Sequence, residues 1–233
     1  MDTWIALARG PFFRVALTIC VLGLAYRLLT TTWQIRTAYT RAGDKRLDNQ
    51  AIFKATLQWL LPVRLFRLRP LYGLASAAFH AGIILVPLFY VGHVTLWQRS
   101  LPLAWPTLGP LLSDILTIVA AVGLGLILLT RLFDTASRDL TRREDVSILL
   151  VLLALMLSGY WAAHPASSPF NPRGMLLVHI LLGDLALILT PTTKIVHCVL
   201  APLTQLLSEV GWRFPAASGR HVAMVLSKEK EPI

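Results

Sequence analysis

The sequence predicts an all-α integral membrane protein built as a bundle of five helices. Its 233 residues are 55% hydrophobic and only 15% charged, with a mean hydropathy of +0.63. Such a composition is typical of polytopic membrane proteins rather than of soluble domains. Five apolar segments each approach the roughly 20 residues that a helix needs to cross a bilayer. No run of about ten residues alternates polar and apolar side chains as a barrel strand does.

The five predicted spans cover about 12–32, 71–97, 108–129, 146–163 and 174–200, and a tail follows over 205–233. Since no internal repeat or low-complexity stretch divides the chain, 1–233 is predicted to be a single membrane domain. No cleavable signal peptide is expected, because the first apolar run has no small-residue cleavage site. Cys20 and Cys198 both fall in apolar segments, which favours packing over a disulfide or metal–thiolate role.

The distribution of Lys and Arg predicts the orientation. Most of the 22 Lys and Arg lie between the first two spans, between spans three and four, or near the C-terminus, whereas Arg9, Arg14, Arg99 and Arg173 lie on the opposite side. The positive-inside rule then places the N-terminus outside and the C-terminus in the cytoplasm of a bacterial inner membrane. The net charge of +10 is attributed to these loops and to anionic lipids, not to nucleic acid.

Two features near the membrane surface have an ordinary explanation. Residues 51–69 mix Leu, Phe and Trp with Lys and Arg, so they could form an amphipathic interfacial helix or a docking surface for a soluble subunit. Trp97, Trp105 and Trp161 lie near span ends and fit an aromatic belt without any further role.

Four histidines stand at membrane depth, where ionisable side chains are functional candidates by default. His179 and His197 are 18 residues apart, so one helix would place them on a common face, roughly 27 Å apart along its axis. His80 and His93 are 13 residues apart, which on an ideal helix rotates them about 220° from each other. Pro87 and Pro191 lie between the members of each pair and could kink the helices.

The opposed directions of spans two and five pair these histidines. His80 and His197 fall at the cytoplasmic level, and His93 and His179 fall at the outer level. Two such pairs are what two six-coordinate haems b require, with neutral imidazoles on both axial positions of each iron. The alternative is a bundle whose histidines serve only in packing.

Quinol oxidation would need a proton acceptor near a haem edge. Asp114, at the outer end of span three, and His164, in the outer loop, are the candidates there. Asp184 lies between the two haem levels and is a candidate proton relay or partner of a ligand. The alternatives are a helix N-terminal acid for Asp114, a solvated loop histidine for His164 and a buried protonated carboxyl for Asp184.

Haem propionates are anionic and need cationic partners. Arg131 on the inner side, Arg173 on the outer side and Lys194 one turn before His197 are placed for that role. Ordinary snorkelling to the membrane interface explains each of them equally well.

The segments LASAAFHAGIILVPLFYVGH (74–93), ILLTRLF (127–133) and VHILLGDLALILTPTTKIVH (178–197) resemble the membrane cytochrome b, or gamma, subunit of respiratory nitrate reductase and its relatives. The resemblance covers nearly the whole chain. It implies that the four histidines ligate two haems b, that the subunit anchors a cytoplasmic iron–sulfur protein, and that it exchanges electrons with menaquinone or ubiquinone.

The chain departs from nitrate reductase itself in two places. Its second span is longer between the histidines and contains Pro87, and its third span carries Asp114 where that enzyme's quinol site has a lysine. These features look more like the branch associated with sulfite reductase, heterodisulfide-reductase-like and Tmc-type complexes. The resemblance then implies an iron–sulfur partner of CCG-domain type or of the nitrate-reductase beta type, and it leaves the terminal substrate and the direction of electron flow open.

Three functions remain open at this point. The first is an electron-transfer subunit of a hetero-oligomeric quinol or quinone oxidoreductase, with electrons running from quinol to the cytoplasmic partner or in the reverse direction toward quinone. The second is a haem-free transporter, against which stands the lack of inverted repeats and of paired broken helices. The third is a haem-containing scaffold without quinone turnover.

Overall fold

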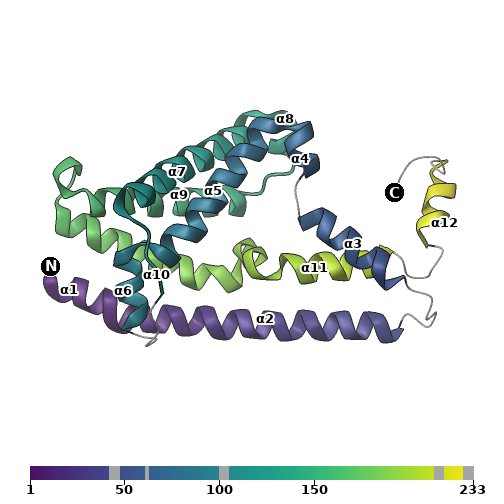
Figure 1. The fold of residues 1–233 in the computed structure, drawn as a ribbon, viewed down its shortest axis with the longest axis horizontal. Helices are drawn as coiled ribbons and strands as arrows, with labels where there is room; N and C mark the ends of the chain where they lie inside the picture. The colour runs from purple at the N-terminus through teal and green to yellow at the C-terminus, as the bar shows by residue number, and fades with distance from the viewer. Residues whose placement is uncertain (42–47, 61–62, 100–104, 213–217, 228–233) are drawn as a thin grey trace. The chain divides into compact units, whose positions relative to one another are not determined.

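The structure is a computed structural model that describes residues 1–41, 48–60, 63–99, 105–212 and 218–227 (Figure 1). In these ranges the regular elements are helices, apart from one isolated bridge between Tyr90 and Leu108. Five helical segments are long and apolar enough to cross a membrane: Asp2–Thr40, Pro70–Phe89, Pro110–Phe133, Arg143–Ala163 and Pro172–Thr192. The prediction of an all-α, multi-pass membrane protein is confirmed.

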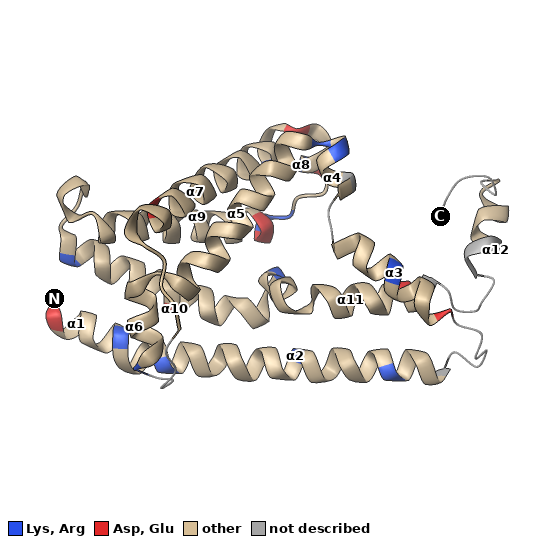
Figure 2. Cartoon of the chain, in the orientation of Figure 1, with Lys and Arg blue, Asp and Glu red and all other residues tan. Residues whose placement is uncertain are grey.

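The helices follow one another with short connections. In chain order they are α1 (Asp2–Leu7), the π-helix η1 (Ala8–Phe12), α2 (Phe13–Arg41), α3 (Asn49–Leu60), α4 (Val63–Leu68), α5 (Pro70–Phe89), α6 (Val91–Gln98), α7 (Pro110–Phe133), α8 (Thr135–Asp139), α9 (Arg143–Ala163), the 3₁₀-helix η2 (Pro165–Ser167), α10 (Pro172–Thr192), the 3₁₀-helix η3 (Lys194–Val196), α11 (His197–Trp212) and α12 (Ser218–Val225). Charged residues gather near helix ends and leave long uncharged stretches between them (Figure 2).

The chain forms two compact units. One consists of residues 1–20 and 64–190, and the other of residues 21–63 and 191–233. In the first unit α5 packs along α7, and α7 packs against α9; in the second, α3 packs against α11. The amphipathic segment predicted at 51–69 is helical in α3 and α4, with residues 61–62 outside the described ranges. The predicted tail is described only over 205–212 and 218–227.

Glycines let α5 and α7 approach closely. A Cβ atom on Gly123 would lie 2.5 Å from the carbonyl oxygen of Ala75, and one on Gly82 would collide with Ala120 and the backbone of Leu116. Small residues at such contacts are what membrane helices use to pack without a hydrophobic driving force between them. The α5–α7 pair is therefore the rigid part of the first unit, from which His80 projects.

The second predicted span is two helices instead of one. Helix α5 ends at Phe89, Tyr90 is extended with ψ 133°, and α6 begins at Val91. Pro87 cannot donate a backbone hydrogen bond and strains the turn before it, which accounts for the end of α5 two residues later. The rotation of about 220° that one ideal helix would place between His80 and His93 therefore does not apply, because the two residues lie on separate helices.

The last four carbonyls of α5, which a helix end leaves without partners in the helix, all have donors. The donors are the backbone N–H of Tyr90 and the Nδ1 of His93 for Val86, the Nε1 of Trp97 for Pro87 (3.0 Å), the Nε1 of Trp105 for Leu88 (2.6 Å) and the N–H of Leu108 for Phe89 (2.8 Å). The expectation that Trp97 and Trp105 serve only as an aromatic belt is therefore wrong. Their indoles cap the broken helix.

The fifth span also breaks, so the expectation that one continuous helix carries both His179 and His197 is wrong. Helix α10 ends at Thr192, one residue after Pro191, and His197 begins α11. The intervening 3₁₀ turn is capped by the Thr193 hydroxyl, which accepts from the Ile195 N–H at 3.3 Å. Proline removes a backbone donor and clashes with the preceding turn, and the chain restarts the helix only after a capped turn.

Candidate functional site

His93 and His179 lie next to each other in the first unit. Their ring centroids are 5.9 Å apart and their planes are tilted by 36°. His93 comes from α6 and His179 from α10, so the break at Tyr90 and the first turns of α10 together bring them into contact. The structure thus places together the two histidines that were expected to form the outer pair.

Helix α9 holds the ring of His179. The Nδ1–H of His179 donates to the carbonyl oxygen of Leu155 at 3.1 Å, and the buried Ser158 hydroxyl lies 3.4 Å from the same nitrogen. Gly159 leaves the space for this contact, because a Cβ atom there would lie 2.8 Å from Cε1 of His179. The ring is therefore fixed by the backbone of a neighbouring helix.

The broken end of α5 holds the ring of His93. Its Nδ1–H donates to the carbonyl oxygen of Val86 at 3.1 Å, and the ring of Tyr90 packs edge-on against it with centroids 5.5 Å apart. In both histidines the bond to a carbonyl places the proton on Nδ1 and leaves the lone pair on Nε2.

His80 and His197 show the same local arrangement. The Nδ1 of His80 lies 2.7 Å from the carbonyl oxygen of Ser76, and the Nδ1 of His197 lies 2.6 Å from that of Lys194. His80 belongs to the first unit and His197 to the second, so their pairing stays a prediction.

The four histidines fit haem ligation in their chemistry, and His93 and His179 also fit it in their spacing. Imidazoles that bind a metal through Nε2 usually donate Nδ1–H to a carbonyl or carboxylate, which fixes the ring and its tautomer, and all four histidines do this. With metal–nitrogen bonds of about 2 Å, two imidazoles on opposite sides of one iron have centroids roughly 6 Å apart. Within the described ranges no cluster of three or more His, Cys, Asp or Glu offers another type of metal site.

A second pair of polar side chains joins α7 to the end of α9. The Nε2 of His164 lies 3.2 Å from Oδ2 of Asp114, and both side chains are about one-third exposed, at 35% and 31%. The ring of Tyr160 stacks on that of His164 with centroids 4.5 Å apart, and His164 donates its Nδ1–H to the Tyr160 carbonyl at 2.9 Å. The two outer proton candidates, which were expected separately, form one dyad.

The dyad and the histidine pair share helix α9. Gly159, against which His179 packs, precedes His164 by five residues, which corresponds to roughly 7.5 Å along a helix axis. The dyad and the residue that His179 packs against are thus little more than one helical turn apart along α9.

Asp184 lies on α10, five residues beyond His179. It is only 7% exposed, and its Oδ2 has no hydrogen-bond partner among the described residues. Burying a carboxyl oxygen without a partner in an apolar span is costly, so Asp184 remains a candidate functional residue.

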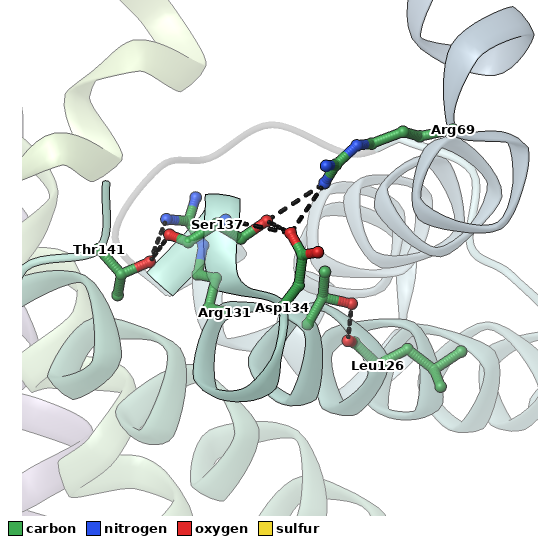
Figure 3. Close-up of polar contacts among 7 residues, drawn as sticks. Arg69, Leu126, Arg131, Asp134, Ser137 and Thr141 are labelled. Carbon is green, nitrogen blue, oxygen red and sulfur yellow. Dashed lines mark hydrogen bonds and ion pairs between the residues drawn. The ribbon is translucent and has the colours of Figure 1, made fainter. Parts of the chain in front are cut away.

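The three cations expected near propionates have different surroundings. The guanidinium of Arg173 pairs with Asp2 at 3.1 Å, and Lys194 supplies the carbonyl that holds His197. Arg131, near the end of α7, reaches the Thr141 hydroxyl only at 3.5 Å, and its buried Nε has no partner in the described part of the chain (Figure 3). Of the three, Arg131 most clearly has a side-chain N–H group that could donate a hydrogen bond to an anionic group.

Just beyond the same end of α7, Asp134, Ser137 and Arg69 form a network of hydrogen bonds outside the membrane-spanning helices (Figure 3). Asp134 caps α8 and accepts from the hydroxyl of Ser137 at 2.6 Å, from its N–H at 3.0 Å, and from Arg69 at 3.2 Å. The bonds from Ser137, followed by the charge and hydrogen bond of Arg69, lower the pKa of the Asp134 carboxyl below its usual value. This network ties the start of α5 to the connection between α7 and α9.

Sequence reasoning missed the residues that position the histidines. Gly159 and Ser158 form the pocket for His179, and Trp97 and Trp105 cap the break that orients His93. The adjacent pair Ser158–Gly159 inside an apolar span was a readable signal, because small residues in spans mark close helix contacts. The carbonyls of Val86 and Leu155 carry no signal in the sequence.

No known family profile matches the chain. A protein of Nitratidesulfovibrio vulgaris (strain Hildenborough), whose description is the single word "Protein", is 33% identical over 208 residues. The alignment covers 84% of this chain and 87% of that protein.

Proposed function

The chain belongs to the same family as the Nitratidesulfovibrio vulgaris protein, and we propose that it is the dihaem b-type membrane-anchor subunit of a respiratory oxidoreductase complex. In this proposal it carries electrons across the bacterial inner membrane between quinone, bound near the outer haem, and a cytoplasmic iron–sulfur subunit. The observation that supports it most is the His93–His179 pair, in which each Nδ1–H donates to a backbone carbonyl and the ring centroids are 5.9 Å apart.

Each of the candidate residues has a separate role in this proposal. His93 and His179 would hold one haem and His80 and His197 the other, with Arg131 neutralising a propionate. Held by two imidazoles, haem b would supply one-electron transfer. The backbone carbonyls at Val86 and Leu155 keep the ligand rings in one tautomer and orientation.

The Asp114–His164 dyad is the proposed proton acceptor for quinol. Oxidation of a quinol releases two electrons and two protons, and the dyad offers a carboxylate and an imidazole already within hydrogen-bond distance. Tyr160, stacked on His164, forms a flat apolar wall beside it. Asp184, buried and unpartnered, is proposed to hold a proton farther along α10.

The direction of electron flow is a separate part of the proposal. With the N-terminus outside, quinol oxidation at the outer dyad would release protons outside and send electrons inward, which makes the reaction electrogenic. The alternative is that the same residues reduce quinone in a complex of the heterodisulfide-reductase-like type. The sign of the membrane potential generated in proteoliposomes distinguishes the two directions.

A haem-free transporter is the second candidate function, and one observation favours it. Helices broken within the membrane line the binding sites of many transporters, and here both α5/α6 and α10/α11 are interrupted after a proline. The sequence argument against a transporter rested on the lack of inverted repeats and of paired broken helices, and these two interruptions weaken only its second part. The common Nδ1-to-carbonyl arrangement of all four histidines favours haem.

Haem content decides between these functions. A reduced-minus-oxidised visible spectrum and a haem count on the purified chain are expected to show two low-spin haems b. The variants His93→Ala and His197→Ala are each expected to lose one of them. A folded chain without haem would overturn the proposal and return the histidines to packing or transport.

A further inference from the structure

An open groove of about 410 Å³ lies where α1 runs through the π-helix η1 into α2, and nothing in the proposed electron transfer uses it. Three arginines line it: Arg9 from η1, Arg14 from α2 and Arg99 directly after α6, together with Asp2 and Ile5. All belong to the first unit. Figure 2 shows basic segments where α1 continues into α2.

Buried packing brings these distant arginines together. Ala8, Phe13 and Val94 are at most 4% exposed, and the rings of Phe13 and Trp97 meet edge-on with centroids 5.4 Å apart. Trp97 is itself fixed by its bond to the Pro87 carbonyl. The π-helix contains Pro11, and such local widening of a helix occurs frequently at functional sites.

The charges of the groove are unbalanced. Among the described residues, Arg9, Arg14 and Arg99 form no side-chain hydrogen bond and no ion pair. The one acidic lining residue, Asp2, has its carboxylate turned to Arg173 at 3.1 Å. Three guanidinium groups around one groove repel each other, and an anion bound between them would relieve this repulsion while forming charge-assisted hydrogen bonds.

The surroundings indicate where this anion comes from. The groove lies near the N-terminal end of the apolar segment Asp2–Thr40, and the end of a membrane-spanning segment is where a chain meets lipid headgroups. Apolar side chains continue from it outward, with Ile5 in its wall and Trp4 and Phe12 on the same helical run at 59% and 45% exposure. A free phosphate would use only the arginines, whereas a phospholipid would use both the arginines and the apolar surface.

We propose that this groove binds the phosphate headgroup of an anionic phospholipid, with its acyl chains along the exposed apolar side of η1 and the start of α2. The site is independent of haem and quinone. Since each interfacial basic residue contributes a factor of roughly 5 to binding of an anionic lipid, removing all three should weaken it on the order of 100-fold.

The test compares lipid binding by the full-length protein and two triple variants. The first carries Arg9→Gln, Arg14→Gln and Arg99→Gln. The control carries Arg36→Gln, Arg138→Gln and Arg143→Gln, which removes the same charge from exposed arginines elsewhere. Each protein is placed in nanodiscs of phosphatidylcholine with graded phosphatidylglycerol, and bound lipid is read by native mass spectrometry after transfer to detergent.

The wild type and the control are expected to retain phosphatidylglycerol. The groove variant is expected to need a phosphatidylglycerol concentration about 100-fold higher to retain the same amount. Excess inorganic phosphate that leaves lipid retention unchanged supports the lipid as ligand, whereas displacement by phosphate alone would show a simple anion site and overturn the lipid. Equal loss in both triple variants would overturn the site itself. A thermal melt of each variant in pure phosphatidylcholine shows whether it is folded.

Discussion

His93 and His179 face each other with ring centroids 5.9 Å apart, although each is anchored to a different helix through its Nδ1. The anchors are backbone carbonyls on α5 and α9, which substitution of neighbouring side chains leaves in place. Both rings are therefore oriented before any ligand arrives. Such preorganisation by a supporting shell is what a metal-ligating pair needs.

The first prediction concerns the dependence of one haem on both members of this pair. His93→Ala and His179→Ala are each expected to remove one of the two haems, and the double variant is expected to lose no more than either single variant, because the two residues serve one site. A pyridine haemochrome count per chain measures this. His164→Ala is the control and should keep both haems. Loss of both haems in the double variant would contradict the pairing.

The second prediction concerns the space that Gly159 leaves for His179. Gly159→Ala places a methyl group 2.8 Å from Cε1 of the imidazole, so the ring must shift and the site is overpacked, at a cost of about 1–3 kcal/mol. The outer haem is expected to show a lower occupancy and a changed midpoint potential in a redox titration. Gly125→Ala on α7 is the matched control, since nothing lies within 4 Å of its added Cβ. Equal behaviour of the two variants would contradict the role of Gly159.

Features of the structure that follow from hydrophobicity and residue spacing could be predicted from the sequence, whereas the path of the chain after a helix break could not. Apolar segments of membrane-spanning length are visible in any sequence, and the five spans follow from them. The outer histidine pair was also predictable, since the antiparallel spans place His93 and His179 at one level. The breaks at Tyr90 and Thr193 were visible only as two prolines, because a proline indicates a kink without fixing the path that follows.

Contacts across helices were the least predictable part of the site. The hydrogen bond between Asp114 and His164 depends on the packing of α7 against α9, which periodicity alone does not fix. Capping of α5 by Trp97 and Trp105 likewise depends on tertiary structure, since a tryptophan near a span end is equally compatible with a lipid-facing position.

The third prediction concerns the indole of Trp105. Trp105→Phe removes the donor to the Leu88 carbonyl and keeps most of the aromatic surface, so it should destabilise the protein by about 0.5–1.5 kcal/mol. Since the same break orients His93, the outer haem should change in potential while the inner haem does not. Trp33→Phe, at a tryptophan that is 69% exposed on α2, is the control. An effect of equal size on both haems would argue against local capping.

The fourth prediction concerns acid stability at the connection that follows α7. The bonds from Ser137, and then Arg69, lower the pKa of Asp134 in the folded protein below the ordinary 3.8. The stabilisation is complete above that ordinary value and is lost as the pH falls through the lowered folded pKa. In the Asp134→Asn variant, the unfolding temperature should therefore change less with pH between about pH 5 and pH 2 than it does in the wild type. Asp139→Asn, five residues on, is the control. An unchanged pH profile in Asp134→Asn would rule out this contribution.

The fifth prediction concerns proton transfer at the Asp114–His164 dyad. Because the two side chains lie 3.2 Å apart, they are expected to accept a quinol proton as a unit. Asp114→Asn and His164→Gln should each slow haem reduction by a quinol analogue by roughly 10²–10⁴-fold, and the double variant should be little slower than either. Stopped-flow absorbance at the haem bands measures the rate.

Two readouts separate this role from a structural one. Haem content should stay at the wild-type value in both variants, since neither residue contacts the ring of His93 or His179 in the described structure. The loss should appear in kcat more than in KM, because a proton acceptor acts in the transition state. Asp139 lies in α8, between the end of α7 and the start of α9 and far along the chain from the dyad. The control variant Asp139→Asn should therefore oxidise quinol at the wild-type rate. Variants of the dyad that oxidise quinol normally would show that Asp114 and His164 only join α7 to α9.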